Sequence, residues 1–117
     1  RRVLFRSRIC TSLSGGEKRR VALARAVVGE RLAACVNLLP EVQSVYHWQG
    51  QLEEARETPL LCKTTASAAP ALMARLAQLH PYDVPEILSW PIADGLPSYL
   101  SWVAGEVISS PCERKTV

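Results

Sequence analysis

The sequence has few of the residues that mark specialised sites. Its 117 residues include only two His, one Met and one Phe, and its four Cys are far apart, with no CxxC pair. This spacing excludes zinc-ribbon and dithiol redox motifs. The chain also has no GxSxG nucleophile elbow and no HExxH motif. We therefore expect no enzymatic activity, and we expect Cys35 and Cys62, which lie in apolar runs, to act as small buried hydrophobes.

Long apolar runs are missing as well. No run approaches the ~20 residues of a membrane span, and no apolar segment follows the basic N-terminus as it would in a secretory signal. We therefore expect a cytoplasmic protein with no membrane partner. Hydrophobic residues make up 48% of the chain, which is enough to fill the core of one domain, and we expect a single domain over residues 1–117.

Charge is unevenly distributed along the chain. Residues 1–31 carry nine Lys or Arg and two Glu, whereas residues 32–117 carry five Lys or Arg and nine Asp or Glu. A basic segment can bind nucleic acid, but no aromatic residue lies between Ser7 and Cys35 to stack on bases. We therefore expect no nucleic-acid partner.

The stretch from Ala33 to Thr65 predicts a long β-hairpin. Two β-rich runs flank the polar turn Trp48–Gln51, and a two-residue loop ending in Gly is a strong hairpin signal. Alternation places Val42, Ser44, Tyr46 and Trp48 on one face of the first run, and Gln43, Val45 and His47 on the other. Strands of this length exceed the usual ~5–6 residues, so we expect the ribbon to need a partner. Pro59 cannot donate to a strand ladder, which predicts a bulge or an unpaired edge there.

The remaining pattern predicts an α+β fold. A first strand over residues 3–11 is followed by a helix from Gly16 to Ala34, with Ser14 as its N-cap. After the hairpin we expect a helix over residues 67–79, a strand over 84–92 and a helix over 97–108. The order β-α-β-β-α-β-α is typical of a ferredoxin-like βαββαβ sandwich with an extra C-terminal helix. Residues 1–8 form a candidate non-native leader, and residues 109–117 a tail expected to fray.

One N-terminal stretch resembles part of another protein class. Residues 13–26, LSGGEKRRVALARA, look like the signature motif and helix of an ABC-type ATPase. Neither a Walker A nor a Walker B motif accompanies the stretch, and the chain has no room for such a domain. We interpret it as a coincidence of helix-forming residues or a scar of a chimeric sequence, so residues 1–23 are the atypical part of the chain.

The densest group of chemistry-bearing residues lies between His80 and Glu86. An imidazole, a phenol and two carboxylates fall within seven residues that include two prolines. As a metal site, His80 with a Cys thiolate would suit copper or zinc. In the alternative interpretation, His80 caps the last carbonyls of the preceding helix and Glu86 forms a surface ion pair. The spacing alone leaves both open.

From about residue 24 to residue 108 the chain resembles the CutA family of divalent-cation tolerance proteins. The segments that carry the resemblance are ARAVV at 24–28, ERLAACVN at 30–37, SVYHWQG at 44–50, LLCKTT at 60–65, HPY at 80–82 with PEI at 85–87, and GLPSYLSW at 95–102. They occur in the order found in that family. The combination is highly specific, although no single segment is.

This resemblance implies a ferredoxin-like protomer in a homotrimer whose long hairpins pair between subunits. It also implies a role in tolerance to divalent metals, notably a copper ion, and no established catalysis. By position, Cys10, His80 and Glu86 match the residues that would hold the metal. Leu79 stands where some members have a second His.

A second function remains open. Trimeric ferredoxin-like proteins of the PII type bind effectors in clefts between subunits. The loop from His80 to Glu86 could line such a cleft, so the alternative is a PII-like sensor of a small molecule or nucleotide.

Overall fold

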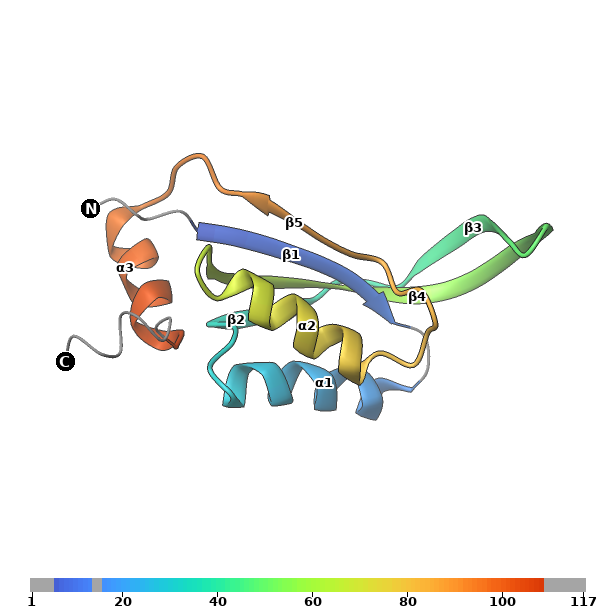
Figure 1. Ribbon diagram of the computed structural model, residues 1–117, viewed down its shortest axis with the longest axis horizontal. Helices are drawn as coiled ribbons and strands as arrows, with labels where there is room; N and C mark the ends of the chain where they lie inside the picture. Colours follow the sequence, from blue (N-terminus) through green and yellow to red (C-terminus); the bar gives the residue numbers. More distant parts are fainter. Residues whose placement is uncertain (1–5, 14–15, 109–117) are drawn as a thin grey trace.

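The computed structural model describes residues 6–13 and 16–108, with side chains described from residue 16 onward. The elements, in chain order, are β1 (Arg6–Leu13), α1 (Glu17–Gly29), β2 (Cys35–Leu38), β3 (Val42–Trp48), β4 (Gln51–Thr65), α2 (Ala69–Leu79), β5 (Ile87–Pro91) and α3 (Pro97–Glu106) (Figure 1). Strands β2 and β3 are two halves of one run in the long hairpin. The predicted β-α-β-β-α-β-α order is therefore confirmed.

The sheet has the strand order expected for a ferredoxin-like sandwich. Strands lie in the order β2-β4-β1-β5, and every neighbouring pair is antiparallel. Helices α1 and α2 lie side by side on one face of the sheet, and α3 lies at its end (Figure 1). Because both helices lie on the same face, they leave the opposite face of the sheet uncovered. Leu88 and Trp90 of β5 are exposed there.

The core lies between the two helices and the sheet. Along β4, Leu60, Cys62 and Thr64 are buried, whereas Leu61 and Lys63 between them are only half-buried. The buried cluster joins this strand to both helices and includes Leu23, Val27, Leu32, Ala33, Leu60, Cys62, Ala69, Leu72 and Leu76. The prediction that Cys62 is buried is confirmed. Cys35 is half-buried, with its Sγ 3.9 Å from Lys63 Nζ.

Helix α1 is shorter than the pattern predicted. It ends at Gly29, and Arg31 adopts a left-handed backbone with φ of 60° that turns the chain away from the helix axis. The Ala34 N–H then donates to Lys63 O and begins the pairing with β4. The predicted helix end at Ala34 is therefore wrong, because the apolar residues after the turn belong to the approach to β2. Gly16 is the N-cap without a side-chain cap bond, and the predicted N-cap, Ser14, lies outside the described residues.

The predicted ends of the chain are described only in part. The proposed leader over residues 1–8 overlaps β1, which starts at Arg6. The tail over residues 109–117 lies outside the described residues.

An exposed ion pair connects the two helices. Arg75 of α2 donates to both carboxylate oxygens of Glu30, at 2.9 Å from Nε and 3.0 Å from Nη2. The hydrogen bond from Arg75 is the main cause that lowers the pKa of Glu30 from its ordinary value; desolvation opposes it, and the charge of Arg75 adds a smaller lowering effect.

The hairpin leaves the sheet as an arm. We use "arm" for residues 42–57, which comprise β3, its turn and the first part of β4, and "body" for the other described residues. Gln49 and Gly50 both have positive φ, 52° and 79°, which defines the two-residue turn predicted from the sequence. Because of the arm, the molecule measures 51 × 26 × 26 Å (Figure 1).

Pro59 lies where the arm meets the body. Its carbonyl accepts from the Leu39 N–H at 2.9 Å, so its nitrogen faces the same edge of β4, toward the break between β2 and β3. At this break three residues, 39–41, lie opposite two, 58 and 59. Of the two alternatives predicted for Pro59, the bulge is confirmed. The extra residue on the opposite run interrupts the regular pairing here, so no backbone N–H is required from residue 59.

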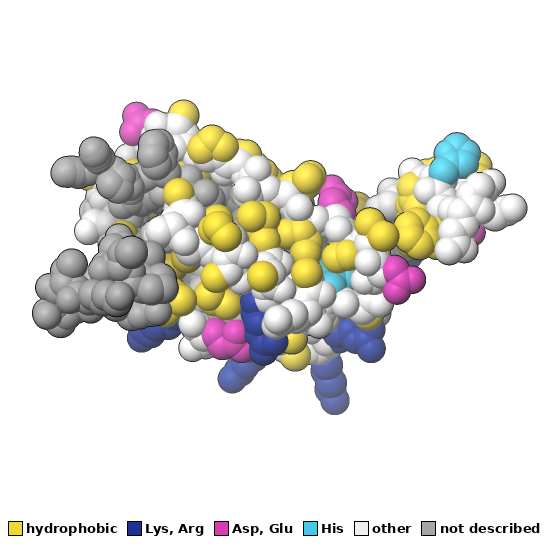
Figure 2. All heavy atoms as spheres, in the orientation of Figure 1, with side chains coloured by type: hydrophobic (Ala, Val, Ile, Leu, Met, Phe, Trp, Pro, Cys, Tyr) yellow, Lys and Arg dark blue, Asp and Glu magenta, His cyan; other side chains and the backbone are white. Residues whose placement is uncertain are grey.

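The surface differs between the helices and the arm. Lys and Arg side chains gather along the α1 edge, whereas hydrophobic side chains continue from the body onto the arm (Figure 2). On the arm, Val45 is 61% and Leu52 66% exposed. Within the described part of the chain, no helix has the length and apolar character needed to cross a bilayer.

Candidate functional site

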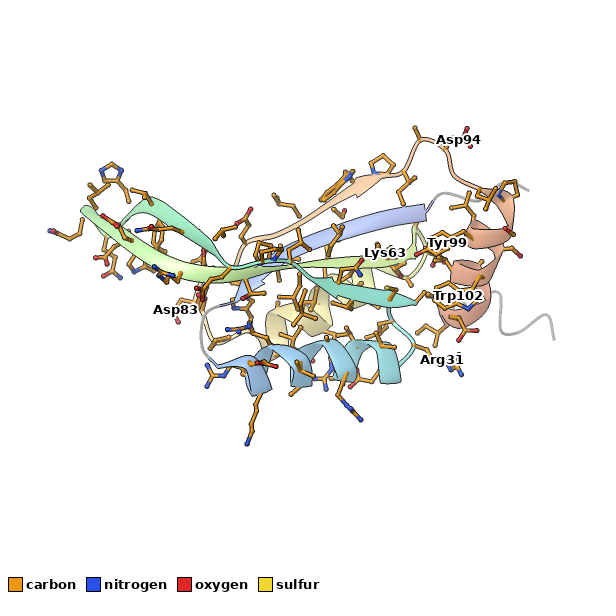
Figure 3. The ribbon with its side chains drawn as sticks, turned by 180° about the vertical axis from the view of Figure 1, so that it is seen from behind. Arg31, Lys63, Asp83, Asp94, Tyr99 and Trp102 are labelled. Carbon is orange, nitrogen blue, oxygen red and sulfur yellow. The ribbon has the colours of Figure 1, made fainter. Side chains whose placement is uncertain are left out.

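A cleft of about 670 Å³ opens where the arm joins the body. One wall is the face of the arm that carries Ser44, Tyr46, Trp48 and Glu57, and the other is the loop over residues 81–86. Asp83 of this loop lies beside the base of the arm (Figure 3). The volume falls in the range of small-molecule sites, roughly 300–1,000 Å³.

The strand register explains why these arm residues share a wall. Side chains two residues apart along a strand lie on the same face. Ser44 pairs with Ala55, and Glu57 pairs with Val42, so Ser44 and Glu57 are diagonal neighbours on one face. The predicted division of β3 into two faces is consistent with this arrangement.

The Glu57 carboxylate is the best-anchored polar group of the cleft. The Ser44 hydroxyl donates to its Oε1 at 2.7 Å, and the Tyr82 hydroxyl donates to its Oε2 at 3.0 Å. Both donors are neutral, and no Lys or Arg of the described chain forms an ion pair with Glu57. Among the described residues, both partners of this carboxylate are therefore neutral hydroxyl groups.

Sequence reasoning missed the role of Glu57. The sequence does not distinguish it from its acidic neighbours Glu53 and Glu54, but the structure shows it half-buried and held by two hydroxyls. The signal was present in the hairpin register, because a turn at Gln49–Gly50 places Ser44 and Glu57 diagonally on one face.

His80 positions Tyr82. The backbone N–H of His80 donates to Leu76 O and closes α2, while its Nδ1 accepts from the Tyr82 N–H at 3.3 Å. The two rings meet edge to face, with centroids 4.4 Å apart. The residue is only 6% exposed. Because Nδ1 accepts a hydrogen bond, the neutral ring carries its proton on Nε2.

The three predicted metal-binding residues lie on different elements. Cys10 is in β1, where it pairs with Leu61 and Leu88, and its side chain is outside the described part. Glu86 is exposed in the cleft and immediately precedes β5, whose first residue pairs with Thr11. Among the described residues, no three His, Cys, Asp or Glu side chains gather in a way that could hold a metal. The metal site therefore stays a prediction.

The fold and the cleft define a class before any relative is considered. The protein is an α+β sandwich with an antiparallel sheet, two helices on one face and a projecting hairpin that forms one wall of a cleft. A sequence model of the family described as "CutA1 divalent ion tolerance protein" matches residues 9–106. The chain therefore belongs to the CutA family.

Two relatives show how far the likeness extends. The chain is 53% identical over 81 residues to the divalent-cation tolerance protein CutA of Thermus thermophilus, covering 69% of this chain and 79% of that protein. It is 46% identical over 101 residues to protein CutA of Homo sapiens, covering 86% of this chain but only 56% of the human protein. The chain thus spans little more than half of the human relative.

Solved structures agree with the family assignment. The divalent cation tolerance protein of Thermus thermophilus superposes with a TM-score of 0.82 at 43% identity, covering 88% of this chain and 99% of that one. CutA1 from Oryza sativa gives a TM-score of 0.86 at 33% identity, covering 92% and 97%. A structure titled "PII-like protein CutA from Nostoc sp. PCC 7120 in apo form" gives 0.79 at 31% identity, covering 87% and 97%.

Proposed function

We propose that this protein contributes to divalent-cation tolerance in the cytoplasm as a non-enzymatic homotrimer that binds copper weakly. The observation that carries the proposal is the family match over residues 9–106, together with relatives named for cation tolerance. The absence of nucleophile and metalloprotease motifs from the sequence supports the non-enzymatic part.

The exposed arm supports the homotrimer. Its apolar side chains, among them Val45 and Leu52, have no cover within the protomer, and a hairpin with free strand edges readily pairs with another chain. Light scattering at micromolar concentration is expected to give three times the chain mass of 12.9 kDa. A stable monomer would contradict the assembly. Leu52→Lys is expected to weaken it, and Gln51→Lys, which adds the same single positive charge at a neighbouring exposed position, is the charge-matched control.

Copper binding is proposed for Cys10, His80 and Glu86. Imidazole nitrogen and thiolate sulfur are suitable copper ligands. Ligation by His80 through Nε2 requires the proton to move to Nδ1, which breaks the hydrogen bond from the Tyr82 N–H. Ligation is therefore coupled to rearrangement of the 80–82 turn, and we expect the affinity to be low.

A Cu(II) titration tests this donor set. Cys10→Ser and Glu86→Gln are each expected to weaken binding, whereas Glu53→Gln at an exposed arm position is expected to leave it unchanged. His80→Ala is a third variant, judged only if its far-UV circular dichroism matches that of the unaltered protein. Equal copper affinity in the unaltered protein and in the Cys10→Ser, Glu86→Gln and His80→Ala variants would exclude this site.

The second candidate function is a PII-like sensor of a small molecule or nucleotide. The likeness to the structure titled a PII-like CutA supports this function in general. The cleft of about 670 Å³, with three carboxylates and no Lys or Arg in its lining, favours the small-molecule form of it. A rise in melting temperature with nucleotides, and none with copper, would favour the sensor over the metal-tolerance role.

A further inference from the structure

We propose that the cleft at the base of the arm binds a small organic ammonium ion. The cationic head would lie against the Glu57 carboxylate, and the apolar body would lie along Tyr46 and Trp48. This inference goes beyond metal tolerance and does not require copper to bind, although Glu86 belongs both to the cleft lining and to the proposed copper ligands. It gives the second candidate function a ligand class.

The charge of the cleft selects a cation. Of the residues that line it, three are carboxylates, namely Glu57, Asp83 and Glu86, and none is Lys or Arg. The Arg nearest to Glu57 in the sequence, Arg56, instead contacts Glu41 at 3.2 Å, outside the lining. A cation entering the cleft therefore meets three carboxylates, and no Lys or Arg is among the described residues that line it.

Glu57 is prepared for this role before any ligand arrives. Ser44 and Tyr82 each hold one of its oxygens, and the ring of Tyr82 is in turn fixed against His80. Each carboxylate oxygen can accept more than one hydrogen bond, so capacity for a ligand N–H or a close N⁺–CH₃ contact remains. A pre-positioned carboxylate lowers the entropic cost of binding.

The aromatic residues favour an organic cation over a hydrated metal ion. Tyr46 and Trp48 follow Ser44 on the same face of β3 at steps of ~7 Å, and both rings are partly exposed. An aromatic face attracts an ammonium group and covers its alkyl body. A single metal ion would leave most of a cleft of this size empty and would gain nothing from the rings.

Choline is a suitable probe, because its neutral isostere 3,3-dimethylbutan-1-ol has the same shape without the charge. Isothermal titration of the full chain is expected to show saturable choline binding, one per protomer, and binding of the neutral alcohol at least about tenfold weaker. Saturable binding should also change the fluorescence of Trp48, and this change should disappear in Trp48→Leu.

Two variants separate the carboxylate from the rings. Glu57→Gln keeps the shape and an acceptor for the hydroxyls, and is expected to weaken choline binding about tenfold or more. Trp48→Leu changes an exposed position near the arm's turn, which leaves the core intact, and is expected to weaken binding several-fold. Glu54→Gln is the matched control, since Glu54 contacts Gln43 on the opposite face of the arm.

The outcomes are decisive. No saturable choline binding, equal binding of the neutral alcohol, or unchanged affinity in both Glu57→Gln and Trp48→Leu would each overturn the proposal. Copper binding that depends on Glu57, with no choline binding, would make the cleft a metal site and overturn it as well. Failure of the copper titration in Cys10→Ser and Glu86→Gln bears only on the metal proposal, so the two proposals can fail separately.

Discussion

The body and the arm share one strand, β4, yet they use it differently. From Thr58 onward, β4 alternates buried and half-buried residues against α1 and α2, whereas before Glu57 its residues are largely exposed. The body therefore follows the rule of a half-covered sheet, in which one face contacts the core. The arm has two uncovered faces, so its apolar side chains are available to a ligand or to another copy of the chain.

The largest expected effect contrasts one leucine from each region. Leu72→Ala empties a fully buried site between α2 and the sheet and is expected to reduce the free energy of unfolding by about 2–5 kcal/mol. Leu52→Ala removes the same atoms from an exposed arm position and is expected to change the free energy of unfolding by less than about 0.5 kcal/mol. Urea unfolding at low protein concentration measures both. Equal losses would show that the arm is as well buried as the body.

Tyr82→Phe tests whether the arm is fastened to the body through Glu57. The change removes the 3.0 Å hydrogen bond to the carboxylate and is expected to cost about 1.5–3 kcal/mol, the usual range for a bond to a charged group. Tyr99→Phe removes a hydroxyl from an exposed ring on α3 and serves as the control. A Tyr82→Phe protein as stable as the control would mean that this bond contributes nothing.

Gly→Ala changes in the arm and in the body are expected to have opposite effects on stability. Gly50 has φ of +79° in the arm's turn, so Gly50→Ala is expected to destabilise by about 1 kcal/mol. Gly29 ends helix α1 with open space around the added Cβ, so Gly29→Ala is expected to stabilise by up to ~1 kcal/mol. Thermal melts of the two variants should move in opposite directions. A shift in the same direction would contradict the backbone argument.

The smallest expected effect lies on the surface of the body. Because Arg75 lowers the folded-state pKa of Glu30, the ion pair stabilises the fold above the ordinary Glu pKa. This contribution is lost as the pH falls through the lowered pKa. Glu30→Gln should therefore match the unaltered protein in acid and be slightly less stable near neutral pH. The pH dependence of the melting temperature measures this, with Glu53→Gln as the exposed control, and identical profiles for both variants would exclude the contribution.

Much of the fold could be predicted from the sequence because its signals are local. Alternation over residues 42–48 and the Gln49–Gly50 turn determine the hairpin, and periodic leucines determine α2. The end of α1 could not be predicted in this way. Leu32, Ala33 and Ala34 continue an apolar pattern, and only their contacts with the core and with Lys63 show that they have left the helix.

Only one of the two walls of the candidate site could be predicted from the sequence. The loop from His80 to Glu86 was identified from its composition, but its partner across the cleft was not, because Glu57 resembles the other acidic residues of the arm. The bond between Tyr82 and Glu57 joins residues 25 positions apart. A contact of this kind depends on how α2 places the loop beside the arm, which is tertiary information.

The position of Pro59 has a mechanical consequence. At residues 58 and 59 the opposite run changes register, so β4 is the one strand that continues without interruption from the tip of the arm to the centre of the sheet. Glu57 faces the cleft, the next residue, Thr58, is buried, and so is Leu60 two residues further along. Binding of a ligand or of a neighbouring copy to the arm is therefore coupled to the core through the backbone of β4 alone. We expect such binding to slow amide hydrogen exchange along Leu60–Thr64, although these residues lie outside the arm.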